Sequence, residues 1–191
     1  MTAGGPDDDA GLVARALAGE ERAFTALMRA HKDRLYRFIR AYVRDADEAF
    51  DLIQETFVAA WLALERYDPK RPMDVWLRRI ALNKCRDWTR RRAVRSFFFG
   101  ARSLEGNPVD IAAHLTGNDG EEAKFAALEG AIATLPTALK EALLLTALDG
   151  RSHKEAAVIL GVTAKAIELR VYRARTQLAQ VLGTALSDAE G

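Results

Sequence analysis

The segment SHKEAAVILGVTAKAIELRVYRAR, which starts at Ser152, holds the most informative spacing in the chain. Ser152 and Glu155 form a capping box, which satisfies two free N–H groups and starts a helix. Ala157, Gly161 and Ile167 then supply a small residue where two helices touch, a glycine that allows a positive φ at a turn, and an apolar anchor in a second helix. This pattern predicts a helix-turn-helix.

The second helix of this motif follows Thr163, whose hydroxyl is placed to cap it. In the functional interpretation, the N-terminal half of that helix lies in the major groove of duplex DNA. The alternative is an ordinary helical hairpin whose charges are only solvated. The residues expected to contact DNA are Lys165, Glu168, Leu169, Arg170 and Arg173, with Tyr172 exposed beside them.

A second cluster is strongly basic, although the whole chain has 28 Lys+Arg against 27 Asp+Glu and a formal charge of +1. Local positive charge attracts phosphate, and Asn83 offers a donor and an acceptor to a base edge. Trp76 and Trp88 lie within the cluster, either as stacking surfaces or as core residues. A solvated basic face is the alternative for the arginines, because helix C-termini favour cations. The basic residues are Arg78, Arg79, Lys84, Arg86, Arg90, Arg91, Arg92 and Arg95.

The third signal is an acidic, amide-bearing run, Asp51-Leu52-Ile53-Gln54-Glu55. In a helix, Asp51, Gln54 and Glu55 share one face. Carboxylates repel DNA, so the functional interpretation of this face is a protein-binding surface. A plain solvated helix is the alternative.

Composition excludes several other classes of protein. Cys85 is the only cysteine, which excludes an internal disulfide and a cysteine-based zinc site. There is no apolar run of about 18 residues, and the first residues, MTAGGPDDDAGL, are acidic, so we expect no membrane insertion, no export signal and a cytoplasmic location. The sequence lacks a phosphate-binding glycine loop and HExxH, and His31, His114 and His153 have no ligand spacing; we therefore expect no enzyme activity, metal or cofactor.

The elements that position these residues are expected to be helices, because apolar residues recur at helical rather than strand spacing. In the third predicted helix, one face carries Ile53, Phe57, Ala60, Trp61 and Leu64, and Val58 shares another face with Asp51, Gln54 and Glu55. A short helix opened by the Asp7 to Asp9 run precedes a long one that spans Phe24 to Val43. The other predicted helices lie at about 47–64, 74–92, 122–134, 137–148, 152–160 and 163–182.

These helices predict an all-α chain of two small helical domains joined by a flexible linker. We expect the first domain at 8–95, the linker at 96–122 and the second domain, with its helix-turn-helix, at 123–184. The aromatic triplet Phe97-Phe98-Phe99 stands in this linker. It either packs back on the first domain or contacts a partner.

Two parts of the sequence, in order, resemble the sigma-70 family of bacterial transcription initiation factors. AFTALMRAHKDRLYRFI and DLIQETFVAAWLALERYDPKRPMDVWLRRIALNKCRDWTRRR are similar to the family's second region, which binds polymerase and the minus-ten element. LPTALKEALLLTALDGRSHKEAAVILGVTAKAIELRVYRARTQL is similar to the fourth region, which recognises the minus-thirty-five element. The chain has no counterpart of the first and third regions, and so resembles the short extracytoplasmic-function (ECF) class.

The resemblance implies a factor that binds core RNA polymerase and directs it to specific promoters, for a stress or envelope-signal regulon. It implies duplex DNA at the minus-thirty-five element, single-stranded DNA at the minus-ten element, and an anti-sigma protein as a further partner. Asp51, Gln54 and Glu55 would then bind core polymerase. The minus-ten contacts would be Lys70, Arg71, Arg79, Asn83 and Lys84, and the minus-thirty-five contacts those of the helix-turn-helix.

The sequence departs from the family pattern in the fourth region. Ala156 replaces a larger aliphatic residue, and Glu168 with Leu169 replaces a basic-then-small pair, so the usual minus-thirty-five preference does not carry over directly. A conventional helix-turn-helix regulator is the rival function, because the second domain alone would serve it. The acidic run beside a basic, tryptophan-bearing helix favours the initiation factor. A pure interaction module is the third hypothesis.

Overall fold

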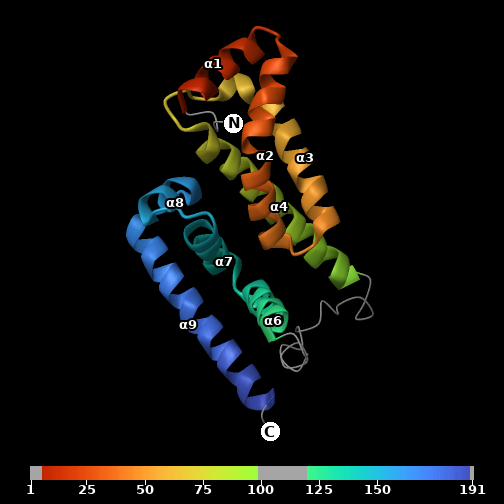
Figure 1. The fold of residues 1–191 in the computed structure, drawn as a ribbon, viewed down its shortest axis with the longest axis vertical. Helices are drawn as coiled ribbons and strands as arrows, with labels where there is room; N and C mark the ends of the chain where they lie inside the picture. The colour runs from red at the N-terminus through yellow and green to blue at the C-terminus, as the bar shows by residue number, and fades with distance from the viewer. Residues whose placement is uncertain (1–5, 99–119, 190–191) are drawn as a thin grey trace. The chain divides into compact units, whose positions relative to one another are not determined.

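The computed structural model describes residues 6–98 and 120–189, with side chains at 9–95 and 127–183. Every regular element in these ranges is helical, which confirms the predicted all-α class. The chain divides into two compact units, Met1–Asp87 and Trp88–Gly191, so the division falls inside one long helix, α4 (Figure 1). The predicted domain limits at 95 and 123 remain predictions.

The first unit is built around helix α2. α1 and α3 both pack on it, and the short 3-10 helix η1 contacts both of them. The predicted apolar face of α2 is buried at Leu35, Phe38, Ile39 and Tyr42, whereas Phe24 is only partly covered. The helices are α1 Pro6–Leu17, α2 Glu21–Val43, α3 Ala46–Leu62, η1 Leu64–Arg66 and α4 Met73–Phe98.

The turn between α2 and α3 is set by two residues. Arg44 adopts the left-handed conformation, with a φ of 63°, which ends α2. Asp45 then accepts a hydrogen bond from the backbone N–H of Glu48 at 2.9 Å, which caps α3. The two helices are therefore joined by a turn of only two residues, Arg44 and Asp45.

One member of the predicted basic cluster belongs to the core. Arg78 is 1% exposed, its guanidinium lies 4.7 Å from the centre of the Phe38 ring, and it donates a hydrogen bond to the Arg34 carbonyl at 3.4 Å. Arg78 therefore ties α4 to α2 and does not reach DNA. Its charge alone places it in the predicted cluster, since arginine is seldom buried.

In the second unit, three helices pack on α9. Its core includes Ala131, Leu135, Leu143, Ala174 and Leu178. The helix predicted at 137–148 is continuous, but its second half is a π-helical segment, η2. The elements are α6 Gly120–Thr134, α7 Thr137–Leu143, η2 Leu144–Leu148, α8 His153–Leu160 and α9 Ala164–Ala189.

Part of the predicted linker is helical. Helix α4 continues to Phe98, beyond its predicted end near Arg92. Phe99 and the side chains of Phe97 and Phe98 lie outside the described residues. No helix in the described ranges is long and apolar enough to cross a bilayer.

Candidate nucleic-acid and protein interfaces

The start of α8 is fixed by the predicted capping box. The backbone N–H of Glu155 donates to the Ser152 hydroxyl at 3.2 Å, and the backbone N–H of Ser152 donates to the Glu155 carboxylate at 2.9 Å. The hydrogen bonds from Ser152, aided by the nearby Arg151, hold the pKa of Glu155 below its usual value. These reciprocal bonds confirm the prediction for this helix end.

The turn and the second helix of the motif also confirm the predicted spacing. Gly161 ends α8 with a φ of 69°, in the left-handed region. The backbone N–H of Ala166 donates to the Thr163 hydroxyl at 3.2 Å, which caps α9. Ala157 and Ile167 are buried where α8 and α9 pack together. The chain therefore contains a helix-turn-helix with α9 as its second helix.

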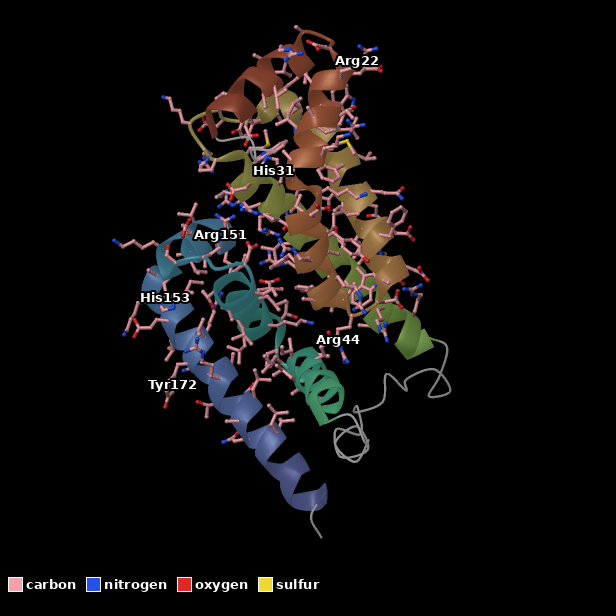
Figure 2. The ribbon with its side chains drawn as sticks, in the orientation of Figure 1. Arg22, His31, Arg44, Arg151, His153 and Tyr172 are labelled. Atoms are coloured by element: carbon pink, nitrogen blue, oxygen red, sulfur yellow. The ribbon has the colours of Figure 1, made fainter. Side chains whose placement is uncertain are left out.

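The outer face of α9 carries the side chains predicted to contact DNA. Lys165, Glu168, Leu169 and Arg173 are exposed, whereas Arg170 is half-buried. Figure 2 shows Tyr172 projecting from the same helix, and its side chain is among the most exposed of the apolar ones. The face is therefore available to a large partner.

Glu168 does not stand alone on this face. Its carboxylate lies 2.7 Å from the Lys165 ammonium, and the hydrogen bond from Lys165 lowers the pKa of Glu168. The partner lies in the same helix, three residues earlier. This pairing reduces the repulsion that a lone carboxylate would feel beside phosphate.

The basic surface of α4 is exposed mainly in its second half. Arg90, Arg91, Arg92 and Arg95 are exposed there, and Arg79 and Lys84 are partly buried. The Asn83 side chain is exposed, and its carbonyl oxygen accepts a hydrogen bond from Arg86 at 3.4 Å.

The two tryptophans of α4 differ in burial. Trp88 is 6% exposed, with the Arg92 guanidinium 5.4 Å from its ring centre, which confirms the core interpretation. Trp76 is half-buried against Tyr67. Neither ring lies open as a stacking platform.

The loop between η1 and α4 holds the other two predicted minus-ten residues. Lys70 and Arg71 are both exposed. The Asp68 carboxylate accepts the backbone N–H of Lys70 at 3.0 Å, and the Asp68 carbonyl accepts the backbone N–H of Arg71 at 3.0 Å. The backbone forms a tight turn, the Lys70 side chain faces solvent, and the Arg71 guanidinium lies 3.6 Å from the Asp68 carboxylate in an exposed ion pair.

The acidic face of α3 meets the basic face of α4. Asp51 and Gln54 are exposed and Glu55 is partly buried. The Glu55 carboxylate lies 3.3 Å from the Lys84 ammonium, with the two side chains 40% and 29% exposed. The sequence predicted Glu55 and Lys84 to belong to different sites, and in the structure they form one ion pair.

An apolar groove opens beside the acidic face, and we call it the α2–α3 groove. Its volume is about 470 Å³, and Gln54 and Lys32 are its polar lining residues. Trp61, which shares a predicted helix face with Ile53 and Phe57, is 42% exposed and makes an edge contact with Phe24 at 4.8 Å between ring centres. The apolar lining is Phe24, Met28, Phe50, Ile53, Phe57, Val58, Trp61 and Leu62.

Most of this groove was not predicted from the sequence, although a signal was present. Phe50, Gln54, Val58 and Leu62 recur every four residues and so form a stripe along α3. Phe50, Val58 and Leu62 are each more than half exposed. Three large apolar residues on one solvent-facing stripe indicate a contact surface.

Comparison with known proteins assigns the class. Residues 27–95 match the family model for Sigma-70 region 2, and residues 125–178 match the model for Sigma-70, region 4. The chain belongs to the sigma-70 family, and its function is that of a transcription initiation factor that directs RNA polymerase. Within that family it is an ECF sigma factor.

Individual sigma factors are similar to this protein over nearly the whole length of the chain. The RNA polymerase sigma factor CnrH of Cupriavidus metallidurans is 39% identical over 92% of this chain and 95% of its own length. The ECF RNA polymerase sigma factor SigC of Mycobacterium tuberculosis is 36% identical over 100% of this chain and 97% of its own. A solved structure of CnrH in complex with the cytosolic domain of CnrY matches with a TM-score of 0.68 and 35% identity, over 93% of this chain and 98% of that one.

Proposed function

We propose that this sigma factor docks on core RNA polymerase through the α2–α3 groove and the acidic face beside it. The observation that carries the proposal is the groove itself, whose apolar lining adjoins Asp51, Gln54 and Glu55. An apolar hollow stabilises a complex by burying surface from water, and flanking carboxylates select a basic partner surface. DNA phosphates would be repelled by the same carboxylates.

The minus-ten element is proposed to bind at the loop between η1 and α4 and at the first half of α4. Opening a duplex and taking a base out of the stack costs a few kcal/mol, which a receiving site must offset. Exposed Asn83 offers a donor and an acceptor to an unpaired base. Lys70, Arg71, Arg79 and Lys84 are proposed to hold phosphates.

The minus-thirty-five element is proposed to bind the outer face of α9. Lys165, Glu168, Leu169, Arg170 and Arg173 form the contact set, with the N-terminal half of α9 in the major groove. Leu169 is exposed and apolar, which suits the methyl group of thymine. Glu168 would accept a hydrogen bond from the amino group of cytosine.

Two further features complete the proposal. The solved CnrH structure contains the cytosolic domain of CnrY, and by similarity we assign this chain an anti-sigma protein as a regulatory partner. The factor works in the cytoplasm, where polymerase and promoter meet, and serves a stress or envelope-signal regulon. It performs no catalysis of its own: binding free energy does all of its work.

Charge reversal on the acidic face tests the docking proposal. The double change Asp51→Lys, Glu55→Lys should abolish co-purification with core polymerase while helicity stays close to wild type and the melting temperature falls little, because Asp51 is exposed and the partly exposed Glu55–Lys84 pair contributes only about 0–1 kcal/mol. Asp33→Lys, Glu65→Lys is the matched control, since both residues are exposed acids of the same unit outside the groove. Normal co-purification of the first variant would reject the assignment.

A further inference from the structure

One side chain connects the two ends of the loop that carries Lys70 and Arg71. Tyr67 follows η1 directly, and it is only 9% exposed. Its hydroxyl donates a hydrogen bond to the backbone carbonyl of Arg71 at 2.6 Å, a short distance for this type of bond. The loop is therefore closed across its base by a side chain that precedes it.

The Tyr67 ring also contacts the helix that follows the loop. It packs on Trp76 in the first turn of α4, with ring centres 5.1 Å apart and planes inclined at 56°. Aromatic pairs at this distance and inclination are favourable beyond the area that they bury. The ring fixes the hydroxyl in place, and the hydroxyl fixes the main chain at Arg71.

We infer that Tyr67 is a positioning residue for minus-ten recognition, holding the Asp68–Pro72 loop in its DNA-binding shape before the strand arrives. The inference rests on the proposed function of that loop. Fixing a loop in advance removes part of the conformational entropy cost that binding would otherwise carry. With the turn made by Asp68, the Tyr67 bond holds the backbone. The Lys70 side chain is exposed, and the exposed Arg71 guanidinium lies 3.6 Å from the Asp68 carboxylate, so both cations stand at the surface where a phosphate can reach them.

The electrostatic surroundings keep Tyr67 in the form that the bond needs. Burial raises the pKa of Tyr67, and the neighbouring carboxylates of Asp9, Asp68 and Asp74 raise it further. The hydroxyl therefore remains protonated, and remains a donor, throughout the pH range in which transcription operates.

Tyr67→Phe removes this hydrogen bond and retains the ring. We expect the holoenzyme made with this variant to bind core polymerase normally and to bind a matched minus-ten single strand about 3- to 10-fold less tightly, as for one lost hydrogen bond. Discrimination against single-base mismatches in that strand should fall, which a purely structural role would not cause. Tyr36→Phe is the matched control, since Tyr36 is a half-buried tyrosine on α2 in the same unit.

The measurement is fluorescence anisotropy of the holoenzyme with single-stranded oligonucleotides from a promoter recovered by run-off selection, together with the melting temperature of each variant. Affinity and mismatch discrimination equal to wild type for Tyr67→Phe would overturn the inference. The double variant Lys70→Ala, Arg71→Ala separates the positioning role of Tyr67 from the proposed DNA-binding role of the loop. If it is impaired while Tyr67→Phe is not, only the positioning role is wrong; if it binds like wild type, the loop does not contact DNA and the proposed function of the loop fails with the inference.

Discussion

The helix-turn-helix of α8 and α9 and the surfaces that α3 forms with α2 and α4 are assembled differently. In the first, the bonds that set the geometry join near neighbours, such as Ser152 with Glu155 and Thr163 with Ala166. In the second, the determining contacts join different helices, such as Glu55 with Lys84 and Phe24 with Trp61. A site of the first kind is encoded locally, whereas a site of the second kind exists only after the helices have packed.

The two surfaces also differ in what they offer a partner. The outer face of α9 is mainly polar and charged, as expected for a surface that contacts DNA. The α2–α3 groove is lined by apolar side chains that solvent reaches, as expected for a protein interface. A variant that damages one surface should therefore leave the affinity of the other surface for its own partner unchanged.

Among single substitutions, the largest effect is expected from a charge placed in the groove. Leu62 is 78% exposed, so Leu62→Asp should fold normally, yet it would bury a carboxylate against polymerase and weaken core binding by about 10- to 100-fold. Binding of the isolated chain to a minus-thirty-five duplex should not change. Leu17→Asp on α1, at a leucine that is 50% exposed outside the groove, is the control. Surface plasmon resonance with immobilised core polymerase measures the difference, and equal affinities would remove Leu62 from the interface.

Glu168→Arg addresses the other surface. If Glu168 contacts a base, the change should alter the preferred base at one minus-thirty-five position, with a specificity change of about 1–3 kcal/mol. Lys165→Met is the companion variant, because it removes the observed ion pair and keeps the carboxylate. Selection from a promoter library gives the preferred motifs. An identical motif for wild type and Glu168→Arg would show that Glu168 only pairs with Lys165.

Ser152→Ala tests how strongly the helix-turn-helix depends on its local bonds. Loss of the N-cap should cost about 1 kcal/mol in the free energy of unfolding. The pKa of Glu155 is lowered in the folded protein, so its stabilising contribution is present above the unfolded value near 4.5 and is lost as the pH falls through the lower folded value.

The difference in the free energy of unfolding between wild type and Ser152→Ala should therefore shrink as the pH falls from about 4.5 through the lowered pKa of Glu155. Chemical denaturation at several pH values measures it. A difference that stays constant from pH 7 down through this range would contradict the role given to the Glu155 carboxylate.

The smallest effect is expected for the Glu55–Lys84 pair. Partly exposed ion pairs contribute about 0–1 kcal/mol, so Glu55→Gln, Lys84→Met and the double variant should show a coupling free energy in that range. Because Glu55 is proposed to bind polymerase and Lys84 to bind DNA, the single variants should separate in function. Glu55→Gln should weaken core binding, and Lys84→Met should weaken open-complex formation on duplex promoters. The reverse pattern would exchange the two assignments.

The sequence predicted the helices and the helix-turn-helix well because their determinants are local. Gly161 and the Ser152 capping box needed no knowledge of the rest of the chain. Prediction from the sequence failed where packing between helices decides which side chains are buried and which are paired. Trp61 has the periodicity of a buried residue and lines an open groove, and Arg78 has the chemistry of a DNA contact and lies in the core. The pairing of Glu55 with Lys84 depends on how α3 and α4 lie together, which no local pattern contains.

Run-off transcription with purified core polymerase on a promoter library tests the central claim most directly. Addition of this chain alone should give transcripts from a defined set of templates that share upstream and downstream motifs, and the Asp51→Lys, Glu55→Lys variant should give none while the Asp33→Lys, Glu65→Lys control retains them. Transcripts that appear only when another sigma factor is already bound to the polymerase would contradict the claim. That result would make the chain a conventional helix-turn-helix regulator.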